Sequence, residues 1–139
     1  MQGMEVRMSF IRIVCSVVAL GAALAATAWA GTPQEQLSAL SAQAGRSPNP
    51  AQGQQFFTTT QGREWSCASC HNAQPTGEGK HANTGKSIAP LAPAFNPERF
   101  TDPAKSEKWF RRNCKDVLAR ECTAAEKADV LAWLINLKR

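Results

Sequence analysis

The residues Cys67-Ala68-Ser69-Cys70-His71 carry the strongest chemical signal in the chain. Two thiols three residues apart on one helical turn can reach the two vinyl groups of a porphyrin, and the histidine that follows points its imidazole at the iron. This C-x-x-C-H spacing is typical of covalent c-type haem attachment. It therefore predicts one haem c per chain, bound covalently through Cys67 and Cys70, with His71 as the proximal iron ligand.

Two other kinds of site use a similar cysteine spacing. A thioredoxin-like redox pair requires a βαβ context, and the sequence shows no strand pattern. A zinc site requires further ligands at close spacing, but the only other histidine is His81. The remaining cysteines lie far from the haem pentad, residues 67–71. Both are weaker interpretations than haem attachment.

The first 30 residues are typical of a secretory signal peptide. Arg7 and Arg12 lie before an uncharged stretch over 13–30 that ends in Ala28-Trp29-Ala30, a small-x-small cleavage pattern. We expect cleavage after about Ala30, with loss of Cys15 and a periplasmic location, and with peripheral or no membrane contact. An uncleaved anchor is the alternative, because this stretch is just long enough to span a bilayer.

The remaining residues, 31–139, are expected to form one monohaem cytochrome c domain. The full chain has 139 residues, is 43% hydrophobic and has a net charge of +5, a composition that excludes wholesale disorder. Loss of Arg7, Arg12 and Glu5 lowers the net charge to +4. This modest charge is offset in part by haem propionates and gives no support for nucleic-acid binding.

Helix signals dominate the expected domain. Thr32 with Pro33 behind it is a helix start, and Gly45 can end that helix. A short helix is expected through Phe56 and Phe57. No strand pattern or internal repeat is visible, so the expected fold is all-α, a small class I-like cytochrome c fold with helices packed around one covalently attached haem.

The second half of the domain is expected to hold a long loop and two helices. Residues 72–100 show little periodicity, and a loop of this length is uncommon unless it is functional. Asp102-Pro103 opens a helix that runs through 109–110. The capping box Thr123-Ala124-Ala125-Glu126 opens the last helix. The expected buried stripe of that helix is Val130, Leu131, Leu134 and Ile135.

Signal cleavage also decides which sixth iron ligands are available. Methionine is the sixth ligand of many c-type haems, but every methionine of this chain leaves with the signal peptide: Met1, Met4 and Met8. The candidates that remain are His81, a lysine, a weaker neutral ligand, or none. His81 lies in a polar, glycine-flanked loop, where an exposed histidine is the simpler interpretation.

Asn113 is a further candidate for the sixth ligand. At 100° per residue it falls with Phe110 and Val117 on one apolar side of its helix. An unpaired buried amide costs about 1–3 kcal/mol, so Asn113 must have a partner. That partner is either a backbone group or the haem iron, and the spacing alone leaves both open. Basic residues point elsewhere on this helix: Lys108, Arg111, Arg112 and Lys115.

Two cysteines follow this asparagine closely. In an oxidising compartment we expect Cys114 and Cys122 to form a disulfide. So short a closed loop stabilises by about 2–3 kcal/mol in the chain-entropy model. The bond would pin the C-terminal end of the Asn113 helix. Two free thiols are the alternative.

Residues 51–137 resemble a group of exported monohaem cytochromes, that of sphaeroides haem protein and cytochrome c″. In this family the residue before the first disulfide cysteine is the sixth iron ligand, either histidine or asparagine. The resemblance therefore implies that Asn113 is the sixth, redox-labile ligand and that the family disulfide joins Cys114 to Cys122. Besides the haem pentad, it rests on the segments Thr84-Gly85-Lys86, Pro90-Leu91-Ala92-Pro93, 96–102, 109–118, 120–123 and 126–129.

The function implied by the resemblance is one-electron transfer with ligand exchange. Ferric iron is held by His71 and Asn113, and reduction releases the asparagine. The ferrous iron is then open to O2, CO or NO. A hard, neutral amide oxygen suits ferric iron better than ferrous iron, which agrees with this order of events. The alternative is a haem enzyme or gas-binding protein that acts on O2, NO or peroxide, and the residues assign no enzyme activity.

The resemblance also implies a redox partner, either a dihaem cytochrome c or a membrane cytochrome b. The basic residues of the Asn113 helix would steer an acidic partner to the protein. An ordinary solvated helix face is the alternative interpretation of the same charges.

Overall fold

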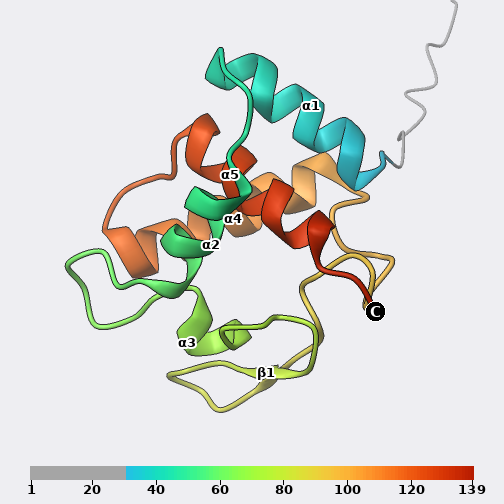
Figure 1. The fold of residues 1–139 in the computed structure, drawn as a ribbon. Coiled ribbons are helices and arrows are strands. Elements are labelled where there is room, and N and C mark those ends of the chain that lie inside the picture. The colour runs from blue at the N-terminus through green and yellow to red at the C-terminus, as the bar shows by residue number, and fades with distance from the viewer. Residues whose placement is uncertain (1–30) are drawn as a thin grey trace, which may run out of the picture.

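The structure is a computed structural model that describes residues 31–139. The expected signal peptide, with Cys15, lies outside the described residues. The elements of the described part are α1 (Pro33–Ala44), α2 (Pro50–Thr58), α3 (Ala68–His71), β1 (Gly79–Lys80), β2 (Ser87–Ile88), α4 (Pro103–Leu118) and α5 (Ala124–Asn136) (Figure 1). The predicted all-α fold is confirmed. None of the helices within residues 31–139 is long and apolar enough to cross a membrane.

Local capping sets the helix ends where the sequence predicts them. The hydroxyl of Thr32 accepts a hydrogen bond from the backbone N–H of Glu35, whose carboxylate accepts one from the N–H of Thr32. Gly45 ends α1 in the left-handed conformation, with φ 64°. Thr123 and Glu126 form the same reciprocal pair at the start of α5. These caps satisfy backbone donors that a helix leaves unpaired.

Helix α5 forms the centre of the core, with α1 and α2 packed against it (Figure 1). The core cluster consists of Phe57, Val130, Trp133 and Leu134. The buried stripe predicted on α5 includes too few residues, because every residue from 127 to 134 is buried and not only one side of the helix. The burial predicted for Ile135 is wrong: this residue is only half-buried, since it lies at the end of the helix that leaves the core.

The long loop over 72–100 satisfies its backbone groups internally. The carbonyl oxygen of Pro75 accepts hydrogen bonds from the N–H groups of Leu91 and Ala92, at 3.0 and 3.1 Å. Strands β1 and β2 pair antiparallel within the loop, with Gly79 opposite Ile88. These strands were not predicted from the sequence, because two residues are too few to show an alternating pattern.

Gly53 allows α2 to approach α5 closely. A β-carbon at this position would collide with the backbone carbonyl of Asp129 on α5. Backbone atoms cannot move aside as a flexible side chain can, so a larger residue would push the two helices apart.

We therefore expect Gly53→Ala to lower the free energy of unfolding by about 1–3 kcal/mol, although alanine is the better helix former. Gly77→Ala is the control, because a β-carbon there meets no atom within 4 Å. Chemical denaturation followed by circular dichroism measures both variants. Equal midpoints for the two would contradict the close approach of α2 and α5.

Candidate haem site

The C-x-x-C-H residues form a single helical turn, α3. The N–H of His71 donates to the carbonyl oxygen of Cys67 at 3.1 Å, which places both cysteines and the histidine on one turn, as predicted. Cys67, Cys70 and His71 are all half-buried. Gly79 lies so close that a β-carbon there would collide with the carbonyl oxygen of Cys70. Strand β1 therefore closes directly over this turn.

Burial and charge keep the imidazole of His71 neutral. Its pKa is lowered to about 4, first by burial and then by the positive charge of Arg99. Its ring lies 6.2 Å from that of Phe57, measured between centroids. A neutral imidazole has a lone pair free for a metal, so His71 can act as an iron ligand at neutral pH.

Cys67 lacks the surroundings of a reactive redox cysteine. Burial raises the pKa of Cys67 to about 11, whereas reactive redox cysteines have a lowered pKa. Within residues 31–139, no group of three or more histidine, cysteine, aspartate or glutamate side chains could hold a metal ion. The haem interpretation is the one that the surroundings of these thiols support.

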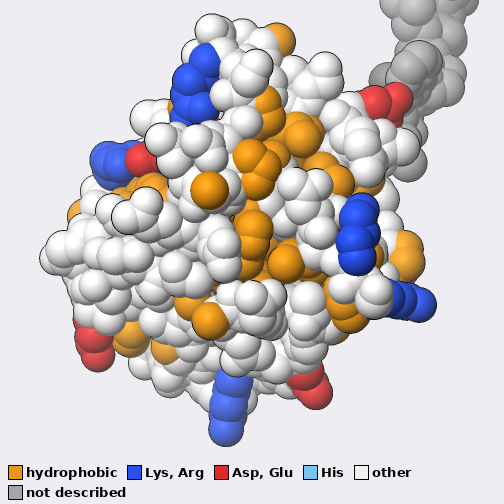
Figure 2. Space-filling view, in the orientation of Figure 1, with side chains coloured by type: hydrophobic (Ala, Val, Ile, Leu, Met, Phe, Trp, Pro, Cys, Tyr) orange, Lys and Arg blue, Asp and Glu red, His pale blue; other side chains and the backbone are white. Residues whose placement is uncertain are grey.

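Apolar side chains from several segments, α3 among them, gather around the core cluster. They pack against the core cluster but remain partly exposed, as a surface that contacts a flat apolar group would be. The hydrophobic residues of this set are Phe56, Cys67, Ala68, Leu91, Phe100, Phe110 and Leu137. A band of hydrophobic side chains runs down the middle of the face drawn in Figure 2. These donors and apolar surroundings fit a haem.

Helix α4 brings Asn113 to the same part of the molecule. Phe110 on α4 packs against the core cluster, and Val117 is 8% exposed. Asn113 lies on the side of the helix that these two residues share, and it is half-buried. Within residues 31–139 its side-chain amide makes no hydrogen bond to protein, and it is not among fully buried polar groups. The backbone partner considered above is therefore absent from this part of the chain.

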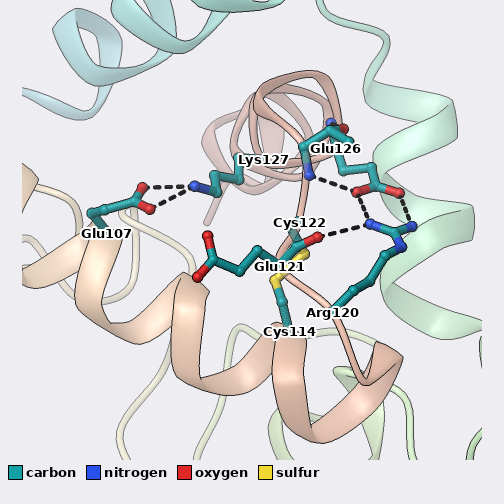
Figure 3. Close-up of a disulfide and its surroundings, with 8 residues drawn as sticks. Glu107, Cys114, Arg120, Glu121, Cys122, Glu126 and Lys127 are labelled. Atoms are coloured by element: carbon teal, nitrogen blue, oxygen red, sulfur yellow. Dashed lines mark hydrogen bonds and ion pairs between the residues drawn. A yellow bond between two sulfur atoms is a disulfide. The ribbon is translucent and has the colours of Figure 1, made fainter.

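A disulfide joins the end of α4 to the segment before α5. Cys114 and Cys122 are bonded, with 5.6 Å between their Cα atoms (Figure 3). Beside the bond, Arg120 donates to both carboxylate oxygens of Glu126, at 2.7 and 2.8 Å. Cys114 is 4% exposed and Cys122 7% exposed, so the bond is part of the core.

His81 lies in the turn between β1 and β2. It is half-buried, and its Nδ1 accepts a hydrogen bond from the N–H of Thr84 at 3.2 Å. That contact gives the ring a structural role in the turn and occupies one of its two nitrogens.

The outer side of α4 is basic. Arg112 lies over the ring of Trp109, 5.6 Å from its centroid, and the Trp109 side chain is 44% exposed. The four basic residues singled out from the sequence are all exposed: Lys108, Arg111, Arg112 and Lys115. Charge and an exposed aromatic ring therefore share one face of the helix that carries Asn113.

Three functional contacts were not predicted from the sequence. Phe57 packs beside His71, Arg99 lies near enough to affect its pKa, and Lys127 pairs with Glu107 between α5 and α4. Each contact joins residues at least 14 positions apart in the chain. No local pattern in the sequence signals contacts of this kind.

The helical fold and the half-buried C-x-x-C-H turn define a c-type cytochrome. Residues 43–134 match a family model described as a domain of unknown function (DUF1924). The cytochrome c-type protein SHP of Cereibacter sphaeroides is 46% identical over 121 residues, which cover 83% of this chain and 93% of that protein. The chain belongs to the SHP family of c-type cytochromes, and its cofactor is haem c.

Two solved structures agree with this assignment. The structure of oxidized SHP, described as an oxygen binding cytochrome c, has a TM-score of 0.70 and 44% identity, over 75% of this chain and 96% of that one. The solution structure of Methylophilus methylotrophus cytochrome c″, reported with insights into haem-ligand detachment, has a TM-score of 0.65 and 35% identity. It matches 77% of this chain and 94% of that one. The cytochrome fold predicted from the sequence is thus confirmed.

We expect removal of the disulfide by Cys114→Ala/Cys122→Ala to lower the free energy of unfolding by about 2–3 kcal/mol, because the unfolded chain regains the freedom of a short loop. Guanidinium denaturation of the haem-loaded protein measures this. Wild-type protein treated with a thiol reductant should lose a similar amount. A midpoint that changes in neither case would contradict the bond.

Proposed function

We propose that this chain is an exported c-type cytochrome that transfers single electrons and whose sixth iron ligand, Asn113, leaves on reduction. One observation carries the proposal: the α3 turn and the inner side of α4 pack on the same apolar cluster. Cys67 and Ala68 contact it from α3, and Phe110 contacts it from α4. A haem attached at α3 would therefore have the Asn113 side of α4 as a neighbour.

Each residue of the site has a distinct role in this proposal. Cys67 and Cys70 hold one haem c through two thioether bonds, and His71 is the proximal ligand in both redox states. When bound, haem c would supply a one-electron iron couple and, in the ferrous state, an iron able to bind O2, CO or NO. The amide oxygen of Asn113 is a hard, neutral donor that suits the ferric ion better than the ferrous ion.

The apolar ring around Asn113 favours exchange of the ligand. The amide leaves without any change in its own charge, so its release needs no proton. Phe110, a turn before Asn113, is half-buried against the core cluster and would shield this side of the site from water.

The N-terminal sequence supports export. A chain with its haem bound covalently keeps its cofactor in the periplasm, and an oxidising compartment preserves the Cys114–Cys122 bond. We propose cleavage after about Ala30 and one haem on residues 31–139.

Intact mass under denaturing conditions tests the cleavage site, the number of haems and their covalent attachment together. We expect the mass of residues 31–139 plus one haem, because thioether bonds survive unfolding. Cys67→Ala/Cys70→Ala should release the haem, whereas Cys114→Ala/Cys122→Ala should retain it. Loss of the haem from wild-type protein on denaturation would contradict covalent attachment.

Asn113→Ala tests the ligand assignment. We expect ferric haem that is five-coordinate or water-ligated, because the amide oxygen is gone and no side chain of similar reach replaces it. Visible absorption of the ferric protein measures the change. Asn136→Ala, at the exposed end of α5, is the control and should keep the wild-type spectrum. An unchanged ferric spectrum in Asn113→Ala would contradict the assignment.

Binding of CO distinguishes the proposed carrier, whose iron loses its sixth ligand on reduction, from an electron-transfer protein whose iron keeps both ligands. The wild-type protein, reduced without oxygen and mixed with CO, should bind it rapidly, because Asn113 has left. No change in the ferrous spectrum would mean that the sixth ligand stays.

A second candidate function is a haem enzyme or gas-binding protein that acts on O2, NO or peroxide. The description of SHP as an oxygen binding cytochrome c favours it. Consumption of these molecules under turnover would support this candidate. Stoichiometric binding without turnover would support the carrier.

For the redox partner we propose an acidic protein, either a dihaem cytochrome c or a membrane cytochrome b. The exposed basic residues of α4 support this choice, because opposite charges steer association. The rate of electron exchange should then fall as salt concentration rises.

A further inference from the structure

Helix α4 is attached to the rest of the domain unevenly. Its two buried residues, Cys114 and Val117, both lie in its C-terminal half. In the first part of the helix, Phe110 is only half-buried and Trp109 is largely exposed. Apolar burial therefore holds the C-terminal half much better than the N-terminal half.

One ion pair joins the N-terminal half of α4 to α5. The Nζ of Lys127 lies 2.7 Å from Oε1 and 2.8 Å from Oε2 of Glu107. The Lys127 side chain is 10% exposed. A buried charge of this kind adds little net stability, but it is costly without its partner. The position of Lys127 therefore constrains where Glu107, and with it this half of α4, can lie.

The disulfide is the second attachment on the same side of the helix. Glu107 and Cys114 are seven residues apart, or two turns, so both lie on one side of α4, about 10 Å apart along the helix axis. Figure 3 shows both contacts of α4, the ion pair to α5 and the disulfide to the segment before α5. Asn113 directly precedes Cys114, so it points about 100° away from this line.

We propose that the Glu107–Lys127 ion pair positions Asn113 as the sixth ligand, by fixing the tilt and rotation of α4 together with the disulfide. The inference rests on the proposed function. A disulfide alone is a single pivot about which a rigid helix can tilt. Two attachments separated by two turns fix the orientation of α4. Asn113 then stays on the side of the helix that faces the core. Glu107 and Lys127 are thus positioning residues that touch neither haem nor ligand.

The double variant Glu107→Gln/Lys127→Met tests this role. It removes the pair, keeps the net charge and leaves no unpaired buried charge. We expect more high-spin ferric haem and a higher midpoint reduction potential, because Asn113 stabilises the ferric state. A tenfold weaker ferric bond to Asn113 raises a one-electron potential by about 59 mV. Wild-type spectrum and potential, in a variant with full haem content, would overturn the proposal.

The Lys115–Glu121 pair offers a matched control. Its atoms are 3.9 Å apart and both side chains are exposed, so Glu121→Gln/Lys115→Met should change neither the spectrum nor the potential. Lys127→Arg keeps an ion pair with Glu107 and should retain wild-type values. Equal shifts in the two double variants would overturn the proposal, because a general effect of surface charge would then account for both.

The same measurement in an Asn113→Ala background separates this inference from the proposed function. If the pair acts through Asn113, the double variant no longer shifts the potential there. A shift of unchanged size would overturn the positioning role and leave the ligand assignment intact. If Asn113→Ala alone leaves the ferric spectrum unchanged, the ligand assignment itself fails and the inference fails with it.

Discussion

Phe57 on α2 packs its ring against Trp133 on α5, with 5.0 Å between their centroids, and much of the site depends on this contact. Gly53 lets the two helices come close enough for it. On its other side, Phe57 supports the ring of His71. Because the α3 turn and Phe110 pack on the cluster that Phe57 and Trp133 help to form, one apolar contact supports both the C-x-x-C-H turn and α4.

The two sides of the site are held by different forces. On the proximal side, burial and the close approach of Gly79 confine the α3 turn, and His71 is kept neutral and ready to coordinate. On the Asn113 side, α4 has little apolar burial in its first half and relies on an ion pair and a disulfide. Under the proposed function, a helix held at two points would carry the exchangeable ligand, and the confined α3 turn would carry the permanent one.

The family assignment and the charge distribution fit together. SHP is described as an oxygen binding cytochrome c, and ligand binding of that kind needs an accessible iron. Electron transfer needs a surface that partners can reach, and α4 turns its basic residues and Trp109 outward. The helix that would supply the exchangeable ligand therefore also presents the basic surface, so that both properties belong to one element.

Local chemistry was predictable from the sequence: the haem pentad, the all-α class and the capped helix starts all depend on residues within about five positions of each other. Helix periodicity made Asn113 a candidate ligand, and the resemblance favoured that role over a backbone partner. Only the tertiary structure decided the partners of charged core residues. Lys127 and Asp129 are buried on α5, paired with Glu107 and Arg46, which lie 20 and 83 positions away. Such pairs form because chain folding brings distant helices together, and helix periodicity alone cannot indicate which distant side chain arrives.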